Sequence, residues 1–232
     1  MDGAVVLIRH GDEPDDDRVA THLQRRGITH EVRRPWTGQP LDDLLEDGAP
    51  IAGLVVYGGG FDVRQTAEHP FLVDEHRLIE RCLTLDVPVL GLCQGAQSMA
   101  SVLGATVGPP GHPTCEFGMY EVRPTPASAG FLPGPLFVTQ AHFHEFATPA
   151  GAVNLAVSDA FGAQAFQYGA RAYGLQFHPE VTIDGFRRWQ DAPWAMYDLP
   201  GAQPRELQDR LLAEHDAAQG SWFDAFLLSL FT

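Results

Sequence analysis

Residues 88–103, PVLGLCQGAQSMASVL, constrain the fold more than any other part of the sequence. The apolar run 89–92 predicts a buried strand, and the small residues after Cys93 predict a helix that begins with almost no loop. A strand that turns directly into a helix is typical of parallel sheets, because the chain must cross a sheet face before it can begin the next parallel strand. This segment therefore predicts an α/β fold.

The same alternation of strand and helix runs through the residues that precede this segment. We predict strands at 4–8, 30–34 and 53–56, and helices at 18–26, 41–45 and 69–85. This pattern indicates an open, mostly parallel sheet of the flavodoxin-like class with helices on both faces. Ligands bind such sheets at the carboxyl ends of the strands, which is where Cys93 falls.

Past Gly104 the chain becomes rich in short, strand-like apolar runs, at 119–122, 136–139, 153–157, 164–168 and 172–177. Helical patterns return near residue 183, with Pro204 opening a helix through residue 212 and an apolar stripe over residues 223–230. With 44% hydrophobic and 19% charged residues, the 232 residues can build one core. We predict a single domain over residues 1–232 with a helical C-terminal extension from about residue 183.

Charge and composition exclude several classes of function. The formal net charge is -15 and all fifteen basic residues are arginine, so we expect no nucleic-acid partner and no lysine-based catalysis. Neither a signal peptide nor a membrane-spanning run is recognisable, and we expect no membrane partner. Three cysteines do not suggest a disulfide framework, and we expect a reducing, cytoplasmic location.

Cys93 stands where a nucleophile elbow would place its reactive side chain. Gly91 and Gly95 would let neighbouring backbone pass close to the strand-to-helix turn, which projects the side chain between them away from the sheet. The sulfur would also lie at a helix N-terminus, whose dipole favours a thiolate. Most free cysteines are small buried hydrophobes, but the glycine spacing favours a nucleophile here.

The stretch YGLQFHPEVT, residues 173–182, supplies a general base and its partner. A catalytic histidine needs an acceptor on its other ring nitrogen, and Glu180 can be that acceptor for His178 because side chains two apart in an extended chain share a face. A histidine and a glutamate at this spacing are more often surface residues. Together with an elbow cysteine they predict a triad of Cys93, His178 and Glu180.

Glycines 58–60 follow the strand that we expect to lie next to the elbow strand. Their amides, with that of Gln94, could bind the oxyanion that forms when a thiolate attacks a carbonyl. A flexible turn is the alternative interpretation. A phosphate-binding loop is disfavoured, because no lysine follows the glycines.

These motifs resemble the class I glutamine amidotransferases. The resemblance covers about residues 50–182 and rests on the GxCxGxQ pattern around Cys93, the HPE at residues 178–180 and the glycine turn. The chain is most similar to the free-standing proteins that resemble the glutaminase domain of GMP synthase. The resemblance implies that the thiolate attacks the side-chain amide of glutamine or a γ-glutamyl compound, forms a thioester and releases ammonia or an amine, with no cofactor.

The resemblance also implies further site residues. Gly59 and Gln94 would supply the oxyanion amides, and Gln97 would help hold the amino-acid end of the substrate, although by composition it could be a helix-surface amide. Residues 140–146, QAHFHEF, align with a stretch that often reads HGD or HQD and that binds the substrate's amino and carboxylate groups. This implies substrate contacts from His142, Phe143 and His144, and from Glu116 before a substrate-facing strand.

Two departures from the family pattern affect these expectations. Gly60 and Phe61 stand where the family commonly has proline after the two glycines, which predicts a looser loop. Phe143 and His144 replace residues that usually grip glutamine, so the substrate need not be free glutamine. His142, His144 and Glu145 form a cluster that could suggest a metal site. Two histidines two apart on a strand can share one metal, but no third ligand at a recognisable spacing joins them, and we expect no metal.

Three functional interpretations stay open. The chain could pass ammonia to a separate synthetase subunit, since about 230 residues leave no room for a synthetase domain. It could be a stand-alone hydrolase of γ-glutamyl amides or peptides. It could also be a non-catalytic binding or regulatory subunit with the same fold, which the intact triad disfavours.

Overall fold

The computed structural model describes residues 3–231. Its strands are β1 (Ala4–Ile8), β2 (His30–Arg33), β3 (Ile51–Val56), β4 (Val89–Leu92), β5 (Val107–Gly108), β6 (Glu116–Pro124), β7 (Leu136–His142), β8 (Glu145–Phe146), β9 (Val153–Val157), β10 (Ala165–Tyr168) and β11 (Ala172–Leu175). The helices are α1 (Arg18–Arg26), α2 (Asp42–Leu45), α3 (Phe71–Thr84), α4 (Gln94–Val102), α5 (Ile183–Gln190) and α6 (Arg205–Leu230), with a 3₁₀ turn η1 (Pro35–Thr37). None of the helices within residues 3–231 is long and apolar enough to cross a membrane.

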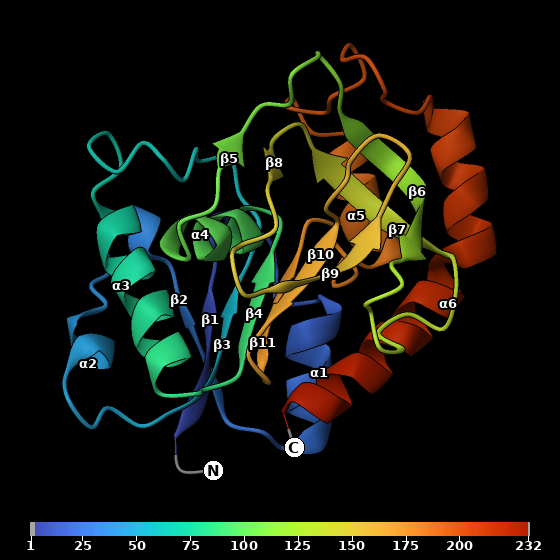
Figure 1. Cartoon of the computed structure of the whole chain (residues 1–232). Coiled ribbons are helices and arrows are strands. Elements are labelled where there is room, and N and C mark those ends of the chain that lie inside the picture. The colour runs from blue at the N-terminus through green and yellow to red at the C-terminus, as the bar shows by residue number, and fades with distance from the viewer. Residues whose placement is uncertain (1–2, 232) are drawn as a thin grey trace.

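One nine-stranded sheet organises the molecule, in the order β2-β1-β3-β4-β11-β10-β9-β6-β7 (Figure 1). The strands from β2 to β11 run parallel, and those from β11 to β7 pair in antiparallel fashion. The parallel part has the flavodoxin-like order, so the predicted fold class is confirmed. Because β1, β3, β4 and β11 are parallel neighbours, their carboxyl ends meet at one edge of the sheet.

Helices cover both faces of the sheet (Figure 1). One core lies between the sheet and helices α1 and α6, and it includes Leu23, Leu92 and Phe223. The other lies between the sheet and helices α2, α3 and α4, and it includes Ile8, Leu78 and Met99. Alternate residues of the parallel strands feed the two cores, which explains why these strands are apolar along their whole length.

The last helix differs from its sequence prediction. A helix through residue 212 and a separate apolar stripe were expected, but α6 runs without a break from Arg205 to Leu230. Its polar middle is helical because it packs through polar contacts: Gln219 is fully buried, and its Oε1 accepts the Thr139 amide at 2.6 Å. On the same helix Asp216 pairs with Arg18 of α1 at 2.6 Å.

The junction between β4 and α4 depends on its two glycines. A Cβ atom on Gly91 would lie 2.6 Å from the carbonyl carbon of Gly95, and one on Gly95 would lie 2.0 Å from the Val56 carbonyl oxygen. Both distances are to backbone atoms, which cannot move aside as a flexible side chain would. The glycines therefore allow α4 to begin directly against β3 and β4.

We predict that Gly95→Ala lowers the free energy of unfolding by about 3 kcal/mol or more, because the new methyl group overlaps the backbone of β3. Urea denaturation of the full chain measures this change. Gly111→Ala is the matched control: no atom lies within 4 Å of its Cβ position, and its effect should stay within about 0.5 kcal/mol. Equal unfolding midpoints for the two variants would contradict the packing argument.

Candidate active site

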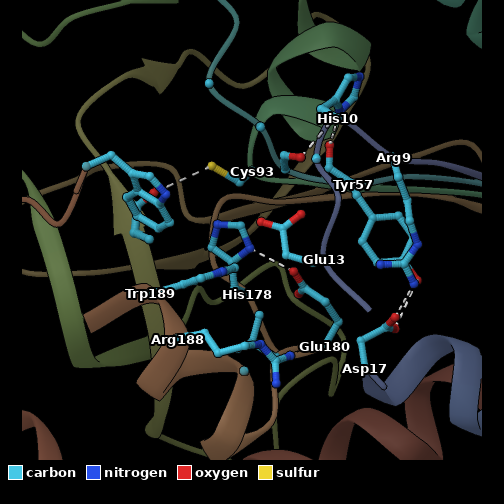
Figure 2. A pocket seen from close by; sticks show the side chains of 18 of the residues that line it. Arg9, His10, Glu13, Asp17, Tyr57, Cys93, His178, Glu180, Arg188 and Trp189 are labelled. Carbon is cyan, nitrogen blue, oxygen red and sulfur yellow. Dashed lines mark hydrogen bonds and ion pairs between the residues drawn. The ribbon is translucent and has the colours of Figure 1, made fainter. Parts of the chain in front are cut away.

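The carboxyl ends of four neighbouring strands bring the functional side chains together. His10 lies just past β1, Tyr57 and glycines 58–60 follow β3, Cys93 follows β4, and His178 comes shortly after β11. All of them line one cavity of about 480 Å³. Figure 2 shows its lining, with Cys93 and His178 near one another and the His178–Glu180 and Arg9–Asp17 pairs beside them.

Cys93 has a backbone conformation that residues other than glycine rarely adopt, with φ of 49° and ψ of -106°. Such positive φ values persist where the surrounding structure enforces them, and they concentrate at functional sites. Here the tight packing of Gly91 and Gly95 enforces the turn. The sulfur is almost fully buried and lies 3.5 Å from the Gln176 side-chain nitrogen. Cys93 therefore lies at a tight turn between β4 and α4, and its role as a nucleophile stays a prediction.

His178 and Glu180 form a buried pair with 2.7 Å between Nδ1 and Oε1. They meet through a turn after β11 rather than along an extended strand, because the Val181 amide bonds back to the His178 carbonyl. Burial lowers the pKa of His178, but the Glu180 carboxylate and the Cys93 sulfur outweigh it and raise the pKa to about 10. The ring of Trp189 packs edge-on against the imidazole, with 4.8 Å between ring centroids.

The glycine turn lies directly against the histidines of the site. A Cβ on Gly58 would come within 2.6 Å of His178 Cε1, and one on Gly59 within 2.5 Å of His10 Cβ. Among residues 3–231 the Gly59 amide has no hydrogen-bond acceptor, and the Gln94 amide opens α4, where backbone donors are free. Two unpaired amides near a buried cysteine can stabilise an oxyanion.

Phe61, which follows Gly60 at the place where the resemblance leads one to expect proline, anchors this turn. Its amide donates to the Gln94 side-chain oxygen at 2.9 Å. Its ring packs edge-on against His69 and Phe71, with centroid distances of 4.9 and 5.0 Å. The departure from the family pattern therefore does not leave the turn without support.

Gln97 is buried rather than exposed on the surface of α4. Its side-chain nitrogen donates to the Gln176 Oε1 atom at 3.2 Å, and Gln176 in turn donates to the Cys93 sulfur. Gln97 is also 3.5 Å from the His144 carbonyl oxygen. It lies behind the nucleophile, outside the lining of the cavity, and a contact between Gln97 and the substrate stays a prediction.

The segment that was expected to contact substrate divides into two parts. His142 is buried, with Nε2 at 3.1 Å from Glu116 and Nδ1 at 2.9 Å from the His144 carbonyl oxygen. Both ring nitrogens of His142 therefore have hydrogen-bond partners. Within residues 3–231, no group of three His, Cys, Asp or Glu side chains is arranged to hold a metal ion. Of these candidates only Phe143 lines the cavity, where its side chain is half exposed. Burial lowers the pKa of His144, whose ring lies near Asp62.

Sequence analysis missed the residues that support the site from β1 and β3. Arg9 pairs with Asp17 and lies 4.3 Å above the Tyr57 ring, and the Tyr57 hydroxyl donates to Asp17 at 2.9 Å. His10 faces the Tyr57 carbonyl oxygen through Nδ1 at 3.1 Å and Glu75 of α3 through Nε2 at 2.7 Å. A signal was available, because Arg9 and His10 directly follow a buried strand in a parallel sheet.

The His10–Glu75 pair is fully buried and fixes the turn between β3 and the glycines. Burial lowers the pKa of His10, but Glu75 and the backbone carbonyls of Gly58 and Tyr57 oppose this and the net shift is upward. Glu75 also accepts a hydrogen bond from Ser98 of α4 at 3.2 Å. This network connects β1, α3 and α4 beneath the site.

We predict that Glu75→Ala lowers the free energy of unfolding by about 3 to 5 kcal/mol, because it leaves the buried His10 imidazole and the Ser98 hydroxyl without their partner. Denaturant unfolding measures the loss. Glu75→Gln keeps a hydrogen-bonding side chain of the same length and should recover most of the stability. If Glu75→Ala unfolded at the wild-type midpoint, the pair would not support the site as described.

The arrangement defines a class of site suited to acyl transfer. A cysteine lies at a strand-to-helix turn, a histidine held by a carboxylate stands beside it, and the glycine turn that carries the Gly59 amide lines the same cavity. Such a site can attack a carbonyl carbon, stabilise the oxyanion and protonate a leaving group.

Comparison with known proteins agrees with this class. The glutamine amidotransferase class-I family model matches residues 17–188. The glutamine-hydrolysing GMP synthase of Phenylobacterium zucineum is 37% identical over 172 residues, which are 71% of this chain but only 30% of that protein. The glutamine amidotransferase-like protein YfeJ of Salmonella typhimurium is 31% identical over 68% of each chain. The crystal structure of a glutamine amidotransferase from Thermotoga maritima superposes with a TM-score of 0.84 at 27% identity and covers 98% of this chain and 97% of its own.

This chain therefore belongs to the class I glutamine amidotransferase family. The matched residues include Cys93, His178 and Glu180, whereas β1 with His10 and the long helix α6 lie outside the match.

Proposed function

We propose that this protein is an amidohydrolase that opens the side-chain amide of glutamine or a γ-glutamyl compound through a thioester on Cys93. The observation that carries the proposal is the meeting of the Cys93 elbow with the buried His178–Glu180 pair in one cavity. Membership of the glutamine amidotransferase family supports the choice of an amide as the bond that is broken.

In the first half of the reaction, the Cys93 thiolate attacks the δ-carbon of the substrate. The oxyanion that forms accepts hydrogen bonds from the amides of Gly59 and Gln94. His178, whose raised pKa keeps it protonated at neutral pH, gives its Nε2 proton to the departing nitrogen as the carbon–nitrogen bond breaks. The products of this half are ammonia or an amine and a γ-glutamyl thioester.

In the second half, the neutral His178 accepts a proton from water, and the resulting hydroxide attacks the thioester carbon. The carbon–sulfur bond breaks and glutamate leaves, which restores the Cys93 thiolate and the protonated imidazole. Glu180 holds the His178 ring in one orientation through both halves and stabilises its positive charge. The substrate contacts expected from Gln97, His142, Phe143, His144 and Glu116 belong to this proposal, and of these five residues Phe143 lines the cavity next to Cys93.

Two settings for this chemistry are compatible with a chain of this size. The chain could deliver ammonia to a separate synthetase subunit, which the similarity to 30% of a GMP synthase supports. It could also act alone in the cytoplasm on γ-glutamyl compounds. The Thermotoga maritima glutamine amidotransferase, which is matched over 97% of its length, supports an independent protein of this size.

The experiment that tests the proposed function is a screen of the isolated full chain for glutamate release from glutamine and from γ-glutamyl amides and peptides. Glutamate is the common product, so the assay does not depend on the leaving group. We expect at least one member of the panel to be turned over repeatedly. No glutamate from any member, with folded protein and a titratable Cys93 thiol, would favour a non-catalytic subunit instead.

A further inference from the structure

The leaving group of the reaction must lie on the His178 side of Cys93, because the proton donor has to reach the departing nitrogen. The residues around His178 on this side, among them Glu180, Val181 and Trp189, line the 480 Å³ cavity. Of the five residues that the family resemblance assigns to substrate contacts, Phe143 lines this cavity, whereas Gln97, His142, His144 and Glu116 do not. The cavity is therefore placed for the leaving group rather than for the glutamyl amino and carboxylate groups.

The size of this cavity exceeds what ammonia needs. Ammonia is comparable to a water molecule, whose share of liquid volume is about 30 Å³. A cavity of about 480 Å³ lies within the range that holds small organic ligands. Because Cys93 and the glycine turn line the same cavity, part of this space holds the reacting carbonyl, and the part on the His178 side can admit an amine that carries a substituent of several carbon atoms.

Aromatic side chains form the outer wall of the cavity. The rings of Trp189 and Trp194 are in contact, with 5.8 Å between centroids. Trp194 and Phe143 are 50% and 49% exposed, although large aromatic residues are usually covered. Exposed aromatic rings that border a cavity next to a nucleophile provide flat surfaces on which an apolar or aromatic group can pack.

The charges of the cavity disfavour a carboxylate on that group. Arg9 is paired with Asp17 and Asp15, and Arg188 is paired with Asp16 at 2.7 Å. Glu13 also lines the cavity and has no ion-pair or hydrogen-bond partner within residues 3–231. Arg9 and Arg188 are therefore already paired with carboxylates, and the charged side chain without a partner, Glu13, is negative.

On the basis of the proposed function, we propose that this cavity is a leaving-group subsite that binds an aromatic or apolar amine without a carboxylate, joined to the γ-carboxyl group of glutamate. The Cys93 sulfur bonds to the amide carbon, the carbon–nitrogen bond breaks, and His178 protonates the nitrogen so that the amine leaves. Water then releases glutamate from the thioester. The substrate class is therefore γ-glutamyl amides of bulky amines, as opposed to glutamine or γ-glutamyl amino acids.

Four substrates test this assignment on the full chain, with glutamate release as the readout. They are glutamine, γ-glutamyl-ethylamide, γ-glutamyl-phenethylamide and γ-glutamyl-phenylalanine, of which the last two differ only by a carboxylate. We expect kcat/KM for the phenethylamide to exceed that for glutamine and for the ethylamide by about tenfold or more, as one buried aromatic ring allows. The phenylalanine compound should fall at least about tenfold below the phenethylamide, because its carboxylate meets no free cation.

Variants of the wall locate the effect. Trp194→Ala should lower the ratio of kcat/KM for the phenethylamide to that for glutamine by about tenfold. Leu199→Ala is the matched control, because Leu199 is a similarly exposed apolar residue in the same loop that does not line the cavity, and it should leave the ratio unchanged. Glu13→Gln should raise activity on γ-glutamyl-phenylalanine relative to the phenethylamide by about threefold, a modest change because Glu13 is exposed.

Two results would overturn the subsite and leave the proposed function standing. One is a higher kcat/KM for glutamine than for the phenethylamide. The other is a ratio of these two kcat/KM values that is the same in Trp194→Ala as in the wild type. Failure to release glutamate from all four substrates would overturn both the subsite and the proposed function.

Discussion

Cys93→Ala is expected to abolish turnover, with glutamate release falling by about 10⁴-fold or more. Without the sulfur no thioester can form, and no other nucleophilic side chain within residues 3–231 replaces it at the elbow between β4 and α4. The remaining site could only orient water against an unactivated amide. Glutamate release under saturating substrate measures the loss, and unfolding by urea checks that the variant is folded.

Cys82→Ala is the matched control for this change. Cys82 is also a free, buried cysteine, but it lies in α3 within the hydrophobic core. Its replacement should lower stability slightly and leave kcat within about twofold of wild type, since it touches no part of the cavity. Turnover that survives in Cys93→Ala would place the nucleophile elsewhere and refute the mechanism.

Glu180→Gln is expected to lower kcat by about 10² to 10⁴-fold while KM changes little. The neutral amide can no longer stabilise the His178 imidazolium, so the effect falls on the transition state more than on substrate binding. Glu206→Gln, at the exposed start of α6, is the control and should behave as wild type. A change confined to KM would contradict the orienting role of Glu180.

The same substitution has a pH signature. In the wild type, burial lowers the pKa of His178, but Glu180 and the Cys93 sulfur outweigh this effect and raise the pKa to about 10. His178 therefore stays protonated across the neutral range. A raised folded-state pKa adds stability that is fully present below the unfolded value near 6.5 and is lost as the pH rises toward 10. Removing the Glu180 charge lowers this pKa, so the alkaline limb of kcat against pH should move to lower pH.

The strands and helices with strong periodicity could be predicted closely from sequence. The bounds of β1, β4 and α1 agree with their predictions, because apolar runs and caps mark their ends without help from distant residues. The two-residue strands β5 and β8 escaped prediction, since their pairing depends on a partner far along the chain. The middle of α6 escaped as well, because Gln219 is buried through a bond to Thr139 that no local pattern reveals.

The residues of the candidate site also fall into those that local sequence spacing indicates and those that only the tertiary fold brings together. Cys93, His178 and Glu180 could be found from local spacing, and the parallel pairing of β4 with β11 explains why the cysteine and the histidine meet. The pair of His10 with Glu75 could not be found, because 65 residues separate them and only the packing of α3 brings them together. In the aromatic wall, Trp189 lies in the last turn of α5 and Trp194 in the loop after it, and their relation to the cavity depends on the tertiary fold.

The most direct test of the central claim is labelling of the native protein with a diazo-ketone analogue of glutamine, followed by peptide mass analysis. The chain carries its own controls, since burial raises the pKa of Cys82 to about 12 and also raises that of Cys115. We predict a single adduct on Cys93 that excess substrate prevents. No adduct on Cys93 in folded protein whose thiol can be titrated, or an adduct on Cys82 or Cys115 instead, would contradict the account.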